Sequence, residues 1–246
     1  TAVFQGDGSL AEQHLREALT LCESLDDVVG VSWLLNDIGE ALVTQDRWAE
    51  AIDYLERAIA AKHQLGDVGS ELHSRHWLGE AHRAGGHWEA ARRCYEACLE
   101  VSDVDASYGG WSRSNLGWMC WRMADHEAAA RHFGTVVRVA LVAPDWDEEA
   151  AILAKVSAAG IGAVAATWKG QTAGISLLSA IQRSLLDETW DGLHLDRRDI
   201  DAAIASSRDA IPTSAWDEAW AQGADLDRDA AMALALTLAT AGMVDG

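Results

Sequence analysis

The chain has 246 residues, enough to bury a substantial core in one large domain or two small ones. Its 19 Lys and Arg against 39 Asp and Glu give a formal net charge of −20, which argues against direct binding to nucleic acid or to an anionic membrane, because both require a cationic face. Hydrophobic residues make up 49% of the chain, so it is not disordered.

An internal repeat dominates the first 141 residues. The segment that starts at Ile38 has a second copy 40 residues later, from Leu78, and a third copy a further 38 residues on, from Leu116. Residues 11–19 match the second half of this unit. A repeat that keeps one spacing over three copies predicts a stack of similar structural units.

Each copy reads as two antiparallel helices. The first helix carries apolar and small residues at helical spacing, as in Leu35, Ile38, Gly39 and Leu42. A polar turn follows. In each second helix a larger residue then stands between two smaller ones at helical spacing: Ala51, Leu55 and Ala58; Ala91, Tyr95 and Cys98; Ala129, Phe133 and Val136. Glycine and alanine let helix axes approach closely, and the larger residue fills the adjoining gap. Because such pairs cannot bury their apolar faces alone, they are expected to stack.

These residues resemble the tetratricopeptide repeat (TPR), a helix-turn-helix unit. The likeness lies in the Leu/Ile-Gly pair of the first helix, in Trp48 or Trp88 after the turn, and in the Ala-x-x-x-aromatic/Leu-x-x-Ala pattern of the second helix. It covers residues 9–141. The period departs from the usual 34 residues of the family, and the proline at the end of the family's unit is absent. The resemblance implies an all-α fold, a right-handed superhelix (solenoid) of helix pairs.

The C-terminal part is expected to continue this solenoid and then to cap it. Further helices are predicted from near Asp147, over 173–184, 196–209, 214–222 and 227–241, with a loop at 187–195 and N-caps at Asp227 and at Thr213 or Ser214. The repeat domain is thus predicted to span 1–186 and the helical cap 187–246. The units of the repeat domain are 1–26 (partial), 27–66, 67–103, 104–142 and 143–186 (degenerate).

The tail carries a second resemblance. From Ala215 it is similar to the end of large multidomain regulators of actinobacteria and related bacteria, with matching residues at Trp220, Ala221, Gly223, Leu226 and Ala231. Those regulators are signal-transducing ATPases with a separate output domain, often a DNA-binding domain for transcription. The resemblance implies that this chain is their C-terminal sensor region and that an upstream ATPase and output domain belong to the same polypeptide.

The sequence contains no specific motif for nucleotide binding or catalysis. A P-loop is absent, and Gly160-Ile161-Gly162 lies in a helical tract of small residues, where close helix packing explains it better than a dinucleotide fold. Ser112 fails the G-x-S-x-G pattern at its last residue. We therefore expect no catalytic residue, no cofactor and no enzymatic activity.

Metal binding has one local candidate. His73, His76 and Glu80 share one helix face at i, i+3 and i+7, yet no fourth ligand is near, and a polar groove surface is the favoured interpretation. No metal is expected. A metal-dependent hydrolase built on His73 and His76 is the less favoured alternative. Cys94, Cys98 and Cys120 fit core positions of the repeat and are interpreted as structural.

The first-helix face opposite the core set is predicted to line the concave groove of the superhelix. Its residues form the candidate binding site: Trp33, Asn36, Glu40, His73, His76, Glu80, Arg83, Trp111, Ser114, Trp118, Trp121 and Arg122. Aromatic residues with interspersed Arg and His are typical of recognition surfaces. Trp118 stands where the other copies have Glu40 and Glu80, so an exposed indole that contacts a ligand is expected there. In the competing interpretation, the C-terminal helices fold back and bury these tryptophans.

The expected function is therefore binding of a protein segment or a small effector in the groove, as a sensor or scaffold domain in signal transduction. Oligomerisation is the alternative. Four cysteines fit a reducing compartment. No run of about 18 apolar residues suggests a transmembrane helix, and no signal peptide is visible. These features predict a cytoplasmic location and no membrane partner.

Overall fold

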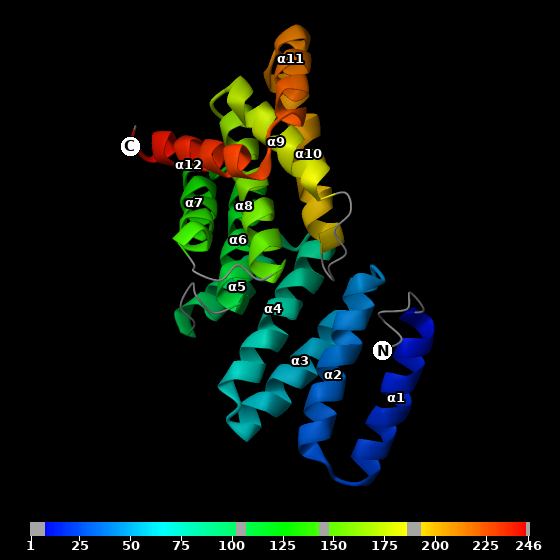
Figure 1. The fold of residues 1–246 in the computed structure, drawn as a ribbon. Coiled ribbons are helices and arrows are strands. Elements are labelled where there is room, and N and C mark those ends of the chain that lie inside the picture. Colours follow the sequence, from blue (N-terminus) through cyan, green and yellow to red (C-terminus); the bar gives the residue numbers. More distant parts are fainter. Residues whose placement is uncertain (1–7, 102–106, 143–147, 186–192, 245–246) are drawn as a thin grey trace. The chain divides into compact units, whose positions relative to one another are not determined.

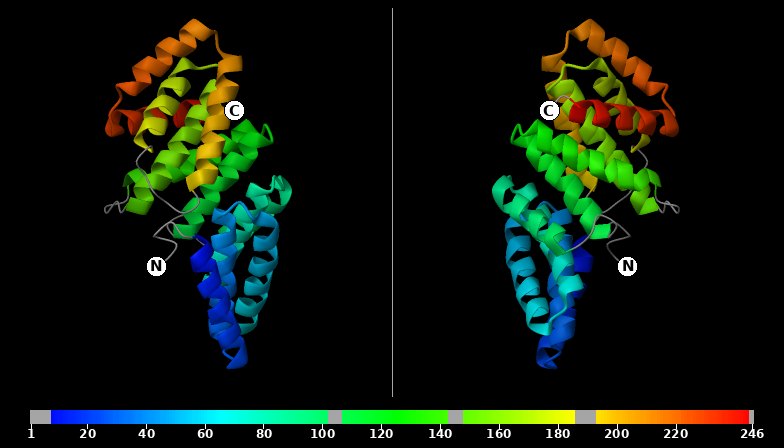
Figure 2. Two further views of the ribbon diagram at one scale, coloured as in Figure 1. Left: turned by 90° about the vertical axis from the view of Figure 1, so that its right-hand side faces the viewer. Right: turned by 90° about the vertical axis from the view of Figure 1, so that its left-hand side faces the viewer.

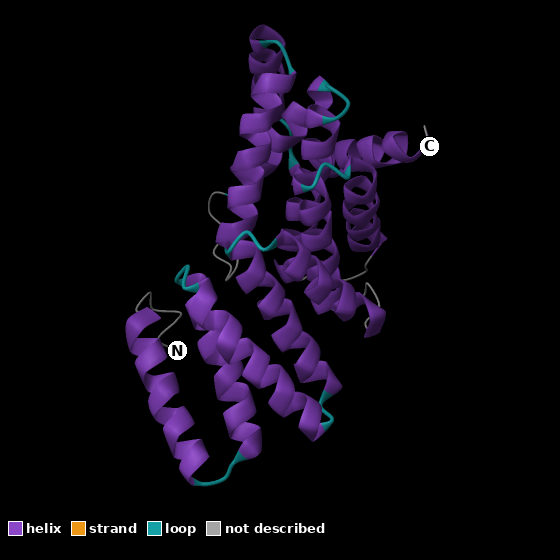
Figure 3. Ribbon diagram, turned by 180° about the vertical axis from the view of Figure 1, so that it is seen from behind, coloured by secondary structure: helices purple, strands orange, loops and turns teal. Residues whose placement is uncertain are grey.

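The computed structural model of the chain describes residues 8–101, 107–142, 148–185 and 193–244. These residues form twelve α-helices and no strand (Figures 1 and 3), which confirms the all-α helical-repeat fold. The chain divides into two compact units, Thr1–Val101 (unit 1) and Ser102–Gly246 (unit 2). The division into a repeat domain over 1–186 and a cap over 187–246 stays a prediction.

Unit 1 is a stack of antiparallel helices. Its members are α1 (Gly8–Ser24), α2 (Val28–Thr44), α3 (Trp48–Leu65), α4 (Val68–Ala84) and α5 (Trp88–Val101). Each helix packs on the one before it, and α2 also contacts α4, so the first helices of successive pairs lie next to each other (Figures 1 and 2). This is the stacking that the repeat predicts.

The two turns that lead into α2 and α4 have the same geometry. Asp26 and Gly66, 40 residues apart, both adopt left-handed backbone conformations, with φ of 53° and 69°. The next residue in each turn is an aspartate that caps the following helix, because the Asp27 side chain accepts from the Gly30 N–H and that of Asp67 from the Ser70 N–H. The joints of the repeat are therefore equal in structure as well as in sequence.

Each helix pair closes through a glycine that faces a large residue 16 positions later. A Cβ atom on Gly39 would lie 2.5 Å from Leu55, and one on Gly79 would lie 2.5 Å from Tyr95. In the third copy, a Cβ on Gly117 would lie 2.6 Å from Phe133. The larger side chains of all three pairs are fully buried. This confirms the prediction that a small residue of the first helix leaves a gap that a larger residue of the second helix fills.

Unit 2 continues with helix pairs and ends in three further helices. Its members are α6 (Ser107–Arg122), α7 (His126–Val142), α8 (Glu148–Thr167), α9 (Thr172–Ser184), α10 (Leu193–Ala210), α11 (Thr213–Ala224) and α12 (Arg228–Val244). Helices α6 to α9 pack consecutively, and α8 also contacts α6. Helix α10 packs on α8 and α9, α11 packs on α9, and α12 packs on α7, α8 and α9 (Figure 1).

The small residues of α8 serve close helix packing, as expected. A Cβ on Gly160 would lie 2.3 Å from Phe133, and one on Gly162 would lie 2.9 Å from the Gly174 carbonyl oxygen. Within α8, Ala150–Thr167 is long and apolar enough to cross a membrane, which corrects the expectation that no such segment exists. Of this stretch 72% is buried inside the protein, as in the core helix of a soluble protein.

The predicted C-terminal helices are present: α10 and α11 extend beyond both predicted ends, α9 begins one residue early, and α12 begins one residue late and ends three residues later than predicted. The Asp227 carboxylate accepts from the Ala230 N–H at 2.8 Å, so this N-cap is confirmed. The predicted N-cap at Thr213 or Ser214 is wrong: Thr213 is already helical, and Pro212, with φ of −54° and ψ of 137°, occupies the N-cap position without a side-chain hydrogen bond. Residues 187–192 of the predicted loop lie outside the described residues, and 193–195 belong to α10.

Candidate binding surface

The predicted groove residues come from equivalent positions of the three first helices, but the copies differ in exposure. The helices concerned are α2 and α4 in unit 1 and α6 in unit 2. Trp33 of α2 is 42% exposed, whereas Trp111, at the equivalent position of α6, is 6% exposed. A shared repeat position therefore does not imply a shared environment, and each unit is described by itself.

In unit 1 the exposed Trp33 ring lies over a buried lysine. The Lys62 Nζ atom is 4.6 Å from the centroid of the Trp33 ring, and the Lys62 side chain is fully buried. Lys62 Nζ donates a 2.9 Å hydrogen bond to Ser74 Oγ. Ser74 Oγ in turn donates at 2.7 Å to Asn36 Oδ1. These buried hydrogen bonds join α2, α3 and α4 beneath the Trp33 indole and support the ring from below.

Lys62 was not among the predicted site residues. Burial lowers the pKa of its ammonium group, while Asp37, Asp67 and Glu40 oppose that shift. The sequence does contain a signal for it, since Lys62 follows Leu55 and Ala58 at helical spacing on the buried face of α3. A charged residue at the next core position of a helix indicates a buried polar cluster.

His73 is a neutral imidazole at the edge of the same face. Its Nε2 atom accepts a 2.9 Å hydrogen bond from the Trp77 indole N–H and lies 3.9 Å from Glu40 Oε2. Burial, with Lys62 and His76 as nearby positive groups, lowers the His73 pKa to about 4. The ring therefore carries its proton on Nδ1 at neutral pH.

Four of the predicted groove residues in unit 1 are buried, so the expectation that they face an open groove is wrong. They are Asn36, His76, Glu80 and Arg83, each less than 9% exposed. Glu80 accepts a 2.7 Å hydrogen bond from the Tyr95 hydroxyl and lies 3.3 Å from Arg83 Nη1. Burial, together with the negative charge of Glu80, raises the Tyr95 pKa. Tyr95, Glu80 and Arg83 therefore satisfy one another's hydrogen-bonding groups inside the unit.

Of His73, His76 and Glu80, the less favoured metal candidate, two residues have other partners. The His73 Nε2 atom is engaged by Trp77, and both carboxylate oxygens of Glu80 have partners. Within the described ranges, no group of three or more His, Cys, Asp or Glu side chains could hold a metal ion. Three of the four cysteines are poor nucleophiles, because Cys98 and Cys120 are buried and burial raises the pKa of the Cys94 thiol to about 11.

In unit 2 the predicted aromatic patch is part of the core. Trp118 is fully buried and packs edge-to-face on Phe133, with ring centroids 5.1 Å apart, and on Trp121 at 5.9 Å. Trp111 and Ser114 are also buried. The prediction of a solvent-facing indole at 118 is therefore wrong, because Phe133 takes the large-residue position of this copy and its ring completes an apolar contact with the indole.

The C-terminal helices cover the groove face of α6, as the competing interpretation proposed. From α8, Ser157 Oγ donates a 2.9 Å hydrogen bond to Ser114 Oγ, and Thr167 Oγ1 accepts one from the Trp121 indole N–H at 3.1 Å. From α10, the Asp199 carboxylate forms a 2.5 Å ion pair with Arg122. This face of α6 is occupied by the chain itself.

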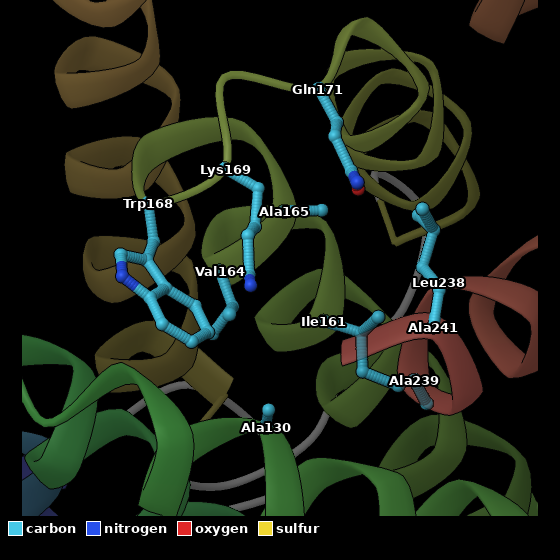
Figure 4. Close-up of a pocket in the computed structure, with 10 residues that line it drawn as sticks. All are labelled: Ala130, Ile161, Val164, Ala165, Trp168, Lys169, Gln171, Leu238, Ala239 and Ala241. Atoms are coloured by element: carbon cyan, nitrogen blue, oxygen red, sulfur yellow. The ribbon is translucent and has the colours of Figure 1, made fainter. Parts of the chain in front are cut away.

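Unit 2 also contains a small cavity between α7, α8 and α12 (Figure 4). Its volume is about 60 Å³, and it is lined by Ala130, Ile161, Val164, Ala165, Trp168, Lys169, Gln171, Leu238, Ala239 and Ala241. The Lys169 ammonium lies 4.1 Å from the centroid of the Trp168 ring. This volume is far below that of a pocket for an organic ligand, so the cavity is not the favoured site.

The helix pairs and their glycine contacts define a helical-repeat protein. Residues 2–63 and 71–141, more than half of the chain, match the sequence profile of the tetratricopeptide repeat. The chain therefore belongs to the tetratricopeptide repeat family, whose domains generally mediate protein–protein interaction or scaffolding and are typically not catalytic. A search of curated proteins found no match to the chain.

Proposed function

We propose that the chain is a protein-binding module that holds a partner segment against the unit 1 face, formed by Trp33, Asp37, Glu40 and His73. Trp33 and Asp37 are exposed, and Glu40 and His73 are partly exposed. The groove face of α6 is occupied by α8 and α10, so the part of the predicted groove that a partner can reach lies on α2 and α4. We assign no catalysis to the chain.

The exposed Trp33 is the observation that carries this proposal. Tryptophan is enriched among the residues that dominate binding energy at protein interfaces. Here its ring is supported from below by Lys62 and by the hydrogen bonds of Ser74 and Asn36, so the indole is held in place before a partner arrives. Preorganisation of this kind lowers the entropy lost on binding.

We further propose that this module is the sensor part of a larger cytoplasmic bacterial regulator, with the ATPase and output domain upstream in the same polypeptide. This step depends on the resemblance of the tail. The tail residues also have packing roles, because a Cβ on Gly223 would lie 2.1 Å from the Ser176 carbonyl oxygen and the Trp220 ring stacks on Trp216 at 4.8 Å.

A peptide array tests the proposed binding face. The purified chain is overlaid on an array of random peptides, and the affinities of the strongest binders are measured by fluorescence anisotropy. Trp33→Ala is expected to weaken binding at least about tenfold, the scale of an interface hot spot. Trp168→Ala is the matched control, since Trp168 is a comparably exposed tryptophan (36%) that also has a lysine over its ring.

Two results contradict the proposal. One is unchanged peptide binding by Trp33→Ala, and the other is an equal loss in Trp168→Ala, which would indicate non-specific contact with indoles. Oligomerisation, the alternative function, predicts a concentration-dependent mass in light scattering and no selective peptide binding.

A further inference from the structure

The end of unit 1 where α2 and α4 begin carries several exposed apolar side chains on its two turns. Among the described residues, nine large apolar side chains are exposed, and six of them lie at this end. We name these six the apolar end patch; they are 42–68% exposed and comprise Leu21, Leu25, Val28, Val29, Leu65 and Val68. The α1–α2 and α3–α4 turns lie at the same end of the unit (Figures 1 and 3).

The apolar end patch is not needed to form the turns that bear it. Both turns close through the same backbone hydrogen bond, from Asp27 N to the Cys22 carbonyl oxygen at 3.0 Å and from Asp67 N to the Lys62 carbonyl oxygen at 3.1 Å. The aspartate caps complete them. Single exposed apolar residues need no explanation, but a cluster on an otherwise polar surface marks an interaction site.

The surroundings of the patch are acidic. Residues 17–46 contain no Lys or Arg, and residues 58–74 contain only the buried Lys62. Glu23 and Asp26 are exposed beside the patch. Arg57 of the neighbouring helix α3 lies 3.9 Å from Glu23 and 3.9 Å from Asp53. Asp27 and Asp67 add negative charge, although each also caps a helix.

We infer that the apolar end patch docks a cationic amphipathic helix of a partner protein, with the apolar side of that helix on the patch and its Lys or Arg residues against the surrounding acids. This inference rests on the proposed function of protein binding and names the chemistry of the partner. A second copy of the chain would bring its own net charge of −20 against these acids, and an anionic bilayer would be repelled in the same way. Positive charge on the partner also speeds its association.

The test uses a fluorescein-labelled amphipathic peptide of about five helical turns, with Leu on one face and Lys on the other, and its Leu/Glu counterpart. Fluorescence anisotropy with the full chain is expected to show binding of the Leu/Lys peptide only. Leu25→Ser/Leu65→Ser is expected to weaken that binding at least about tenfold. Leu10→Ser is the matched control, because Leu10 and Leu65 are both 42% exposed and Leu10 lies outside the patch.

A second pair of variants tests the acids. Glu23→Gln/Asp26→Asn is expected to weaken binding about threefold at low salt and to reduce its salt dependence. Asparagine tolerates the left-handed backbone at position 26, so the turn is preserved. Asp217→Asn/Glu218→Gln removes the same charge from exposed positions of α11 and is expected to leave the affinity unchanged.

Several outcomes would overturn the inference. They are undiminished binding by Leu25→Ser/Leu65→Ser, equal losses in the control variants, or binding of the Leu/Glu peptide. A concentration-dependent dimer or adsorption to phosphatidylglycerol vesicles that only Leu25→Ser/Leu65→Ser abolishes would assign the patch to a second copy or to a membrane instead. If Trp33→Ala loses its array peptides while the patch variants bind the Leu/Lys peptide normally, the proposed function stands and this inference fails.

Discussion

The Tyr95 hydroxyl donates a 2.7 Å hydrogen bond to Glu80, and both side chains are buried in unit 1. The equivalent pair in the third copy is Phe133 and Trp118, whose rings pack edge-to-face at 5.1 Å. A phenol in the core needs an acceptor, which the acid provides, whereas a phenyl ring is satisfied by an apolar neighbour. In the second and third copies, the residue after the repeat glycine thus matches the large residue of the second helix; the first copy, with Glu40 and Leu55, does not follow this pairing.

Tyr95→Phe tests this pairing. It removes one hydrogen bond to a buried carboxylate, so we expect a loss of about 1–3 kcal/mol in the free energy of unfolding, measured by urea denaturation. Tyr54→Phe is the control, because the Tyr54 hydroxyl accepts from Arg16 at a part-buried site, and its loss should stay below about 1 kcal/mol. Equal losses in the two variants would show that the Glu80 pairing has no special weight.

Two glycines of α4 should respond to alanine in opposite directions. Gly79→Ala places a Cβ 2.5 Å from the Tyr95 ring, so overpacking should outweigh the better helix propensity and cost about 1–3 kcal/mol. At Gly69 the nearest atom to a new Cβ is 4.0 Å away, so Gly69→Ala should stabilise the helix by up to about 1 kcal/mol. Thermal unfolding followed by circular dichroism measures both. A gain in stability from Gly79→Ala would contradict the glycine contact.

Trp118→Ala and Trp33→Ala should differ in how much free energy of unfolding they lose, because one indole is in the core and the other is on the surface. Trp118 is fully buried, so its truncation is expected to cost about 3–5 kcal/mol in urea denaturation. Trp33 is 42% exposed, and its truncation should cost less than about 1 kcal/mol, mainly through the lost contact with Lys62. If Trp118→Ala unfolded at the wild-type urea concentration, the burial described for this indole would be wrong.

The free energy of unfolding should decrease as the pH is lowered, because of His73. Its folded pKa of about 4 lies below the ordinary value of 6.5, so the unfolded state binds the proton more readily. The contribution is fully present above pH 6.5 and is lost as pH falls toward 4; at pH 4.5 the loss amounts to about 2.5 kcal/mol. Lys62 and His76 oppose protonation and Glu40 favours it.

Urea denaturation of the wild type and of His73→Asn at pH 7 and pH 4.5 measures this effect. The difference between the two pH values should be smaller in the variant, since asparagine does not titrate. His14→Asn is the control, because His14 is an exposed histidine of α1. An equal pH dependence in the wild type and in His73→Asn would contradict the assignment.

The helix pairs of this protein could be predicted from its sequence alone. Positions such as Gly39 and Leu55 recur in each copy, because a solenoid solves the same packing problem at every repeat and each contact is local in the chain. The buried core at Ala51, Leu55 and Ala58 follows from the same periodicity. The confirmed cap at Asp227 is likewise local, since it involves only the first turn of its own helix.

Only the tertiary structure decided which parts of the first-helix face remain open. Trp33 and Trp111 share a repeat position, yet Trp33 is exposed and Trp111 is buried. The sequence of a repeat specifies which face a side chain occupies, but the helices that cover that face come from distant segments. Here α8 and α10 cover the face of α6, through residues such as Thr167 and Asp199, so the predicted aromatic patch became core.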